Sequence, residues 1–246
     1  MNKRSRTHLV IPDCQVRPGV PLDHLKWIGN YIAEKRPDVI VCLGDFADMA
    51  SLNGYSIGHA SMEGKRYADD IQTTKEAMAS LCRPFQALRN YRPAMHLTLG
   101  NHEDRISREA DANPRFAATI SIDDLGYSDF GWTSHPFLKV LKIDGIEYSH
   151  YFTSGVMGRP VSSAAALLRE RQSSATMGHV QKLDFAVHPK TQRVGLFAGI
   201  CYLHDEPYLT PQGQDTKRQI IMKHEVHDGV YDPMFVSLEY LKRKYS

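Results

Sequence analysis

The sequence lacks the features that mark disulfide-bonded, zinc-ribbon and membrane-spanning proteins. Its four cysteines, at positions 14, 42, 82 and 201, lie far apart and form no CxxC pair, which fits reduced thiols. No stretch approaches the roughly 18 apolar residues that a membrane-spanning helix needs. The apolar run at 9–11 stops at Pro12 and is too short for a signal peptide. We therefore expect a cytoplasmic protein with no membrane segment.

The sequence also has little net charge and no recognisable interdomain linker. Thirty Lys and Arg residues against 28 Asp and Glu residues leave a formal charge of +2, so overall basicity gives no argument for nucleic-acid binding. An apolar share of 42% and a charged share of 24% are typical of soluble globular proteins and disfavour disordered or fibrous classes. Without a Pro-, Gly- or Ser-rich linker, we expect one domain over residues 1–246. Its motif-bearing core spans about 8–200, and C-terminal strands and a basic tail span 217–246.

The first hundred residues alternate between apolar runs and helical periodicity. Runs at 9–11, 39–43 and 95–99 predict buried strands, and the spacing of apolar residues predicts helices at 21–35 and 67–88, with a kink or break at Pro84. Such βαβαβ alternation predicts parallel strands with right-handed crossovers. Open sheets of this kind place their functional sites beyond the carboxyl ends of the strands.

The second half has a different pattern, in which a short helix at 164–171 lies among short apolar segments. We expect these segments to form a second, mostly antiparallel sheet packed on the first. They lie at 137–143, 146–151, 175–177, 193–198, 218–225 and 230–238. The long irregular stretches at 50–66, 104–135 and 202–217 are where functional loops are expected.

Polar clusters follow each of the first three predicted strands. They are Asp13 and Gln15, then Gly44, Asp45 and Asp48, then Gly100, Asn101, His102 and Glu103. Helix capping would explain any one cluster, with Glu103 and Asp104 favourable in a first helical turn. Capping leaves His150 and His179, at the ends of later strands, without a reason. Asp, Asn and His converging on one rim are what a pair of divalent cations requires to clamp a phosphate ester.

These clusters resemble the motifs of the calcineurin-like metallophosphoesterases. That family has DxH, GDxxD, GNHE or GNHD, a lone His and GHxH, in this order. Here the blocks are Asp-Cys-Gln at 13–15, Gly-Asp-Phe-Ala-Asp at 44–48, Gly-Asn-His-Glu at 100–103, His150, and Gly-His-Val-Gln at 178–181. The resemblance extends from about residue 8 to about 200. It implies an α/β fold, a four-layer α/β/β/α sandwich of two mixed sheets flanked by helices.

The resemblance also implies a role for each motif residue. Asp45 would bridge two metal ions, with Asn101, His150 and His179 completing one site and Asp13, Gln15 and Gln181 belonging to the other. His102 would be the catalytic histidine and Asp48 the carboxylate that orients it. The reaction implied is hydrolysis of a phosphate ester by metal-activated hydroxide. Arg105, directly after the third block, is a candidate phosphate contact, although solvation of a helix explains it equally well.

Two residues depart from the family pattern, because Gln15 and Gln181 stand where the family has histidines. An amide oxygen is a harder and weaker donor than imidazole, so this site should favour Mn²⁺ or Mg²⁺ and bind loosely. The alternative is a degenerate, catalytically silent metal-binding module. The presence of every other motif residue, including His102 and Asp45, favours an active enzyme.

The fold alone does not determine the substrate. Met49 follows the second block where the protein-phosphatase branch of the family has Arg, which disfavours a phosphoprotein phosphatase. We therefore expect a phosphodiesterase acting on a nucleotide or nucleic acid. The alternative is a phosphomonoesterase, with phosphoproteins still among its candidate substrates. The basic run at 242–244 is interpreted as a solvated tail, with a weak electrostatic role on polyanions as the other reading.

Overall fold

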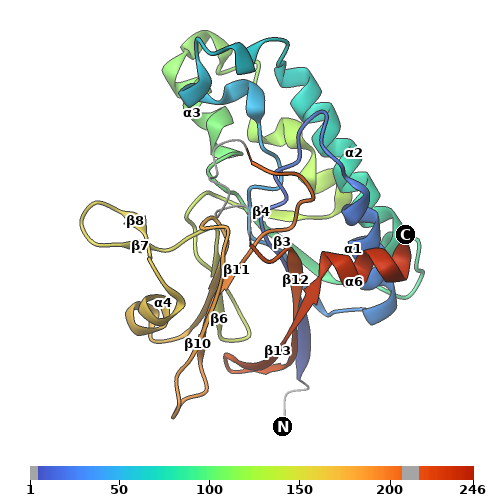
Figure 1. Ribbon diagram of the computed structural model, residues 1–246, viewed down its shortest axis with the longest axis vertical. Helices are drawn as coiled ribbons and strands as arrows, with labels where there is room; N and C mark the ends of the chain where they lie inside the picture. Colours follow the sequence, from blue (N-terminus) through green and yellow to red (C-terminus); the bar gives the residue numbers. More distant parts are fainter. Residues whose placement is uncertain (1–4, 207–215) are drawn as a thin grey trace.

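Two β-sheets packed face to face form the centre of the computed structural model, which describes residues 5–206 and 216–246 (Figure 1). The first sheet has six strands in the order β13-β12-β1-β2-β3-β4. They are β1 (Arg6–Ile11), β2 (Val39–Cys42), β3 (Ala94–Thr98), β4 (Thr133–His135), β12 (Gln219–His227) and β13 (Val230–Ser237). Strands β1 to β4 are parallel, whereas β12 pairs antiparallel with both β1 and β13.

The second sheet has five strands in the order β10-β11-β9-β6-β5. They are β5 (Leu141–Ile143), β6 (Ile146–Ser149), β9 (Ser174–Met177), β10 (Leu183–Val187) and β11 (Val194–Ala198). Strands β6, β9 and β11 run parallel, and the two outer strands are antiparallel to their neighbours. A small hairpin of β7 (Thr153–Ser154) and β8 (Arg159–Pro160) projects from this half (Figure 1).

Helices cover the outer faces of both sheets. Helices α1 (Asp23–Lys35), α2 (Tyr67–Gln86) and α6 (Leu238–Tyr245) pack on the first sheet, and α4 (Ala164–Arg171) packs on the second. Side chains alternate along β1, so Leu9 and Ile11 join the helix-facing core while Val10 joins the core between the sheets. The order of layers is α/β/β/α, which confirms the fold class expected from the resemblance.

Two expectations about the sheets were wrong. The second sheet is not mostly antiparallel, since its three central strands are parallel. The segments at 218–225 and 230–238 form β12 and β13 of the first sheet instead of the second. The reason is that β1 is central: β2 occupies one of its edges, and β12 pairs along the other, with Leu9 opposite Met222. Periodicity predicts strands but does not say which partner a strand takes.

Helices differ from the expectations at four places. Helix α2 continues through Pro84, because a proline this close to the helix end removes only one late hydrogen bond. The stretch 104–135 contains α3 (Asp104–Ala112) and short 3₁₀ turns, and 50–66 contains three more 3₁₀ turns. The basic run at 242–244 is exposed to solvent, as expected, but it forms the last turn of α6 instead of an irregular tail. Much of the predicted loop at 202–217 lies outside the described residues.

No helix among the residues described is both long enough and apolar enough to cross a membrane. All four cysteines are buried and free of disulfides. Cys14 packs in the helix-facing core, as expected for a small apolar residue between two polar neighbours.

Candidate metal centre

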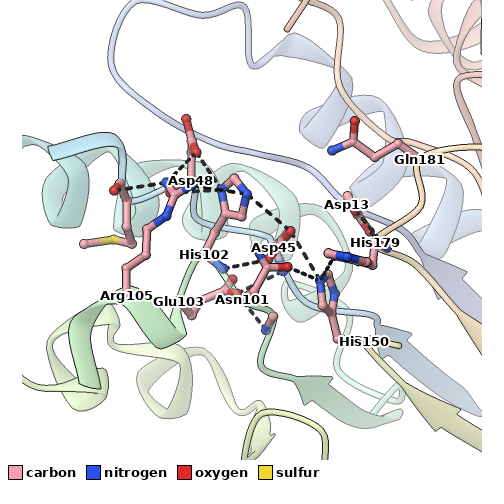
Figure 2. A network of polar contacts seen from close by, with 12 residues as sticks. Asp13, Asp45, Asp48, Asn101, His102, Glu103, Arg105, His150, His179 and Gln181 are labelled. Atoms are coloured by element: carbon pink, nitrogen blue, oxygen red, sulfur yellow. Dashed lines mark hydrogen bonds and ion pairs between the residues drawn. The ribbon is translucent and has the colours of Figure 1, made fainter. Parts of the chain in front are cut away.

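The turns that follow the strands carry the motif residues to one edge of the two sheets, as the sequence predicts. Asp13, Asp45 and Asn101 follow β1, β2 and β3 of the first sheet, while His150 and His179 follow β6 and β9 of the second. Figure 2 shows these side chains gathered between the sheets, with Asp48, His102 and Arg105 continuing the group along the same edge. The two halves of the chain therefore supply one site together.

Two motif glycines make room for the carboxylates. A Cβ atom on Gly100 would lie 2.1 Å from Asp45 Oδ1, and one on Gly178 would lie 2.2 Å from Asp13 Oδ1. Both distances are far below van der Waals contact. The positions of these two carboxylates therefore require glycine in the third and fifth blocks.

Several site residues have left-handed backbones although they are not glycine. The φ angles are 44° at Gln15, 46° at Asp45, 64° at His179 and 58° at Gln181. Such conformations are unfavourable for L-residues and persist where the surroundings enforce them, typically at functional sites. The turns therefore hold these side chains at a cost in backbone energy.

Three ligand atoms converge on the Nε2 atom of His150. It lies 2.9 Å from Asn101 Oδ1, 3.2 Å from His179 Nδ1 and 3.3 Å from Asp45 Oδ2. The other ring nitrogen of His150, Nδ1, donates to the Leu43 carbonyl at 2.8 Å, which leaves a lone pair on Nε2 when the ring is neutral. Among the described His, Cys, Asp and Glu residues, Asp45, His150 and His179 form a group whose ligand atoms lie within 4.8 Å of one another. This donor set fits a divalent cation.

The carboxylates of this cluster favour a positive charge beside them, either a proton or a cation. Burial lowers the pKa of His150, but the Asp45 and Asp13 carboxylates outweigh it and raise the pKa to about 9. Burial and the neighbouring His150 lower the pKa of His179 to about 4. A bound cation would neutralise these carboxylates in place of a proton on His150 and leave both rings neutral, as metal ligation requires.

The Asp13 side of the cluster carries one carboxylate and two amides. Both Asp13 oxygens accept the backbone N–H of His179 at 3.1 Å, and burial raises the pKa of this carboxyl. Gln15 is fully buried, and its backbone N–H donates to the Asp45 carbonyl at 2.8 Å. Gln181 Oε1 accepts the hydroxyl of Tyr202 at 3.2 Å. That these three side chains hold a second cation stays a prediction, because the ligand group found among the described residues contains only Asp45, His150 and His179.

His102 and Asp48 form a buried pair beside the donor cluster. The Nδ1–H of His102 donates to Asp48 Oδ1 at 2.7 Å, and its Nε2 lies 3.7 Å from Asp45 Oδ2. Burial lowers the pKa of His102, but Asp45 and Asp48 outweigh it and raise the pKa above its ordinary value. This shift favours the protonated ring, whose Nε2 faces the Asp45 carboxylate and lies 3.5 Å from Arg105 Nη2.

Two arginines fix Asp48. Arg105 Nη1 donates to the Asp48 carbonyl at 2.7 Å and to its Oδ1 at 3.2 Å, and Arg17 Nη1 lies 2.8 Å from Oδ2. Arg17 also contacts the buried Glu206 at 2.7 Å. Despite the burial of Asp48, His102 and Arg17 lower its pKa to about 2. The contact of Arg105 with substrate stays a prediction, while its contact with Asp48 is direct.

Sequence reasoning missed Glu103 as a structural part of the site. Its fully buried carboxylate accepts the backbone N–H groups of Asp45, Ala47 and Gly100 at 2.9–3.0 Å and the Tyr127 hydroxyl at 3.1 Å. A glutamate after Asn-His also suits an exposed first helical turn, so its position in the sequence gives no sign of burial. Arg17 and Glu206 were missed as well, since nothing in the sequence pairs positions so far apart.

The model of the family described as calcineurin-like phosphoesterase matches residues 7–195, which contain every motif above. The chain belongs to this family. A search of curated proteins gave no match. The family match agrees with the resemblance seen in the motifs. It includes the residues of the candidate metal centre, whereas β12, β13 and most of β11 lie beyond its last residue.

Solved structures with similar folds include two of Vps29 from Entamoeba histolytica. The wild-type protein complexed with zinc is 15% identical, with a TM-score of 0.42 and coverage of 94% of this chain and 99% of that one. A single mutant of Vps29 is 15% identical, with a TM-score of 0.44 and coverage of 94% and 98%. At these values the similarity says nothing about what this chain binds or hydrolyses.

Proposed function

We propose that the protein is a metal-dependent phosphoesterase whose substrates are phosphodiesters of nucleotides or nucleic acids. The observation that carries this proposal is the His102–Asp48 pair. Its histidine places Nε2 3.7 Å from the Asp45 carboxylate, at the edge of the donor cluster. A binding module would need the donor cluster alone. A protonated imidazole held beside that cluster is what departure of an ester oxygen requires.

The residues divide into holding and reacting groups. Asp45, Asn101, His150 and His179 would hold one divalent ion, and Asp13, Gln15 and Gln181, with Asp45 shared, would hold the second. When bound, such ions supply charge neutralisation of the phosphate and activation of water at neutral pH.

His102 would hold the proton at Nε2 and give it to the leaving oxygen. Asp48 fixes the ring through Nδ1, and Arg105 and Arg17 keep Asp48 ionised and in place.

The space around the cluster supports a diester over a monoester. A cavity of about 690 Å³ lies on the His102 side, and another of about 570 Å³ lies on the His179 side. Both are lined by Asn101 and Arg105, so the two cavities flank these residues beside the proposed reaction centre. A phosphomonoester has one substituent and would fill one side only. A phosphodiester has two.

The metal content tests the two proposed sites. We expect purified protein to retain at most one tightly bound ion per chain, at the site that contains His150, and to need added Mn²⁺ or Mg²⁺ for activity, because the amides of Gln15 and Gln181 bind weakly. Elemental analysis after gel filtration, compared with His150→Ala, measures this. Two tightly held transition-metal ions per chain would contradict the assignment.

Activity is tested with aryl phosphate monoester and diester substrates across Mg²⁺, Mn²⁺, Ca²⁺, Zn²⁺ and Ni²⁺. We expect the diester to be preferred, and His102→Ala to lower kcat by about 10²- to 10⁴-fold while metal content stays the same. His227→Ala, at an exposed histidine of β12, is the matched control and should keep full activity. Monoester preference would favour the phosphomonoesterase alternative. Metal binding with no hydrolysis of either ester would favour the silent module.

A further inference from the structure

A cavity next to His102 is built largely by the segment 50–66, which belongs to none of the motif blocks. Its lining includes Asn53, Tyr55, His59 and Lys65 from this segment, together with His102. Because His102 is the proposed donor to the leaving oxygen, whatever leaves must lie on this side of the phosphate. The cavity therefore surrounds the position of the leaving group.

The charges that line this cavity suit an anion. Its two acidic lining residues, Asp48 and Glu206, both contact Arg17, at 2.8 and 2.7 Å. The other charged side chains among the described lining residues are cationic, with Lys65 exposed to solvent. Arg17 thus neutralises the two carboxylates, while Lys65 is available to bind an anion in the cavity.

Tyr55 is held in an exposed position between the two cavities. It lines both of them, and 91% of its surface is exposed. Its backbone N–H donates to Asn53 Oδ1 at 3.2 Å, and Asn53 Nδ2 donates to Ser56 Oγ at 3.0 Å, so a capped 3₁₀ turn fixes the residue. An aromatic ring that is left uncovered on a fixed turn beside cationic groups is suited to stacking on a nucleobase.

We propose that this cavity is a leaving-group subsite for a nucleotide that carries a second phosphate, with Tyr55 stacking on the base and Lys65 binding that phosphate. The inference rests on the proposed function and narrows its substrate class. In the reaction, a water oxygen forms a bond to phosphorus and the P–O bond to the leaving nucleoside breaks. The leaving oxygen takes the proton of His102, and a proton from water restores His102.

The test is a thermodynamic cycle in which a terminal phosphate of the substrate and the Lys65 side chain are removed separately and together. The substrates are the dinucleotide TpT and its two singly phosphorylated forms, pTpT and TpTp, assayed with Mn²⁺. We expect one of the two terminal phosphates to raise kcat/KM about tenfold in the native protein, and Lys65→Gln to abolish that gain. Lys190→Gln, at an exposed lysine of the turn between β10 and β11, should keep it.

Binding gives a second readout that does not depend on turnover. Calorimetric titration of the dinucleotides into His102→Ala should show the same terminal phosphate tightening the affinity, and His102→Ala combined with Tyr55→Leu should weaken binding of all three by about tenfold. No gain from either phosphate in the native protein, or a gain that survives Lys65→Gln, would overturn the subsite. If the proposed phosphodiesterase function itself were wrong, neither TpT nor an aryl diester would be hydrolysed with any metal.

Discussion

The carboxylate of Glu103 has no part in the proposed reaction, yet it determines where the reacting groups lie. It accepts the backbone N–H groups of Asp45 and Gly100, and so joins two strand ends that each carry a candidate metal ligand. The buried carboxylate replaces the water that these N–H groups would otherwise bind. Precision at the site depends on a residue that touches neither metal nor substrate.

Glu103→Gln should therefore destabilise the fold. The amide retains one oxygen acceptor but turns an NH₂ donor toward backbone N–H donors, so we expect the free energy of unfolding to fall by about 2 to 3 kcal/mol. Urea denaturation followed by circular dichroism measures this. Asp111→Asn, at an exposed acid of α3, is the control and should change stability by less than about 0.5 kcal/mol. Equal effects of the two substitutions would show that the Glu103 contacts contribute little.

Residues in motif blocks were the predictable part of the site. The structure brings Asp45, Asn101, His150 and His179 together because parallel strands all end at one edge of a sheet. Pairings between distant segments were not predictable. The contact of Arg17 with Glu206 joins positions 189 residues apart, and no local pattern marks either residue.

At the scale of elements, α6 is a helix that its amino-acid composition does not predict. Leu238 and Leu241 are buried, and Lys244 and Tyr245 each contact Glu34 of α1 at 2.7 Å. Three consecutive basic residues dominate the sequence of this segment and suggest a solvated tail. Periodicity fails here because an eight-residue helix buries so few side chains.

Leu241→Ala should reveal the contribution of α6 to stability. The side chain is fully buried in the helix-facing core, so its truncation should lower the free energy of unfolding by about 2 to 5 kcal/mol. Lys242→Ala, at the next and exposed position, should have little effect. Denaturant midpoints compare the variants. A Leu241→Ala midpoint equal to that of the native protein would mean that α6 docks without contributing to stability.

At the scale of the whole molecule, the two sheets are joined by buried polar contacts as well as by apolar packing. His8 of β1 contacts the Tyr148 hydroxyl of β6 through Nδ1 at 2.8 Å and Asp144 through Nε2 at 3.0 Å. Lys223 of β12 is fully buried beside them, and its Nζ donates to Thr176 Oγ1 of β9 at 2.6 Å. The interface between the sheets therefore contains two basic groups that must be held without full hydration.

Stability should fall in mild acid because of His8. Burial lowers its pKa to about 4 from the ordinary value of 6.5. Between these values the unfolded chain binds a proton that the folded protein does not, so stability decreases as pH falls through that window. For His8 alone, the loss from pH 7.5 to pH 5 is about 2 kcal/mol.

Denaturant midpoints at pH 7.5 and pH 5, for the native protein and His8→Gln, isolate this contribution. The native protein should lose more stability than the variant over this interval, because Gln does not titrate. His227→Gln, at an exposed site, should behave like the native protein. An identical pH dependence of the native protein and His8→Gln would show that His8 titrates normally in the fold.

The strand order has a consequence for how the protein is made. β1 lies between β2 and β12, yet β12 begins at Gln219, more than two hundred residues further along the chain. While the protein is being synthesised on the ribosome, one edge of β1 has no partner until nearly the whole chain has emerged. An apolar strand with an open edge is a template for pairing with other chains. The nascent protein is thus most prone to aggregation after the turns with the motif residues have been translated and before the last two strands have joined the sheet.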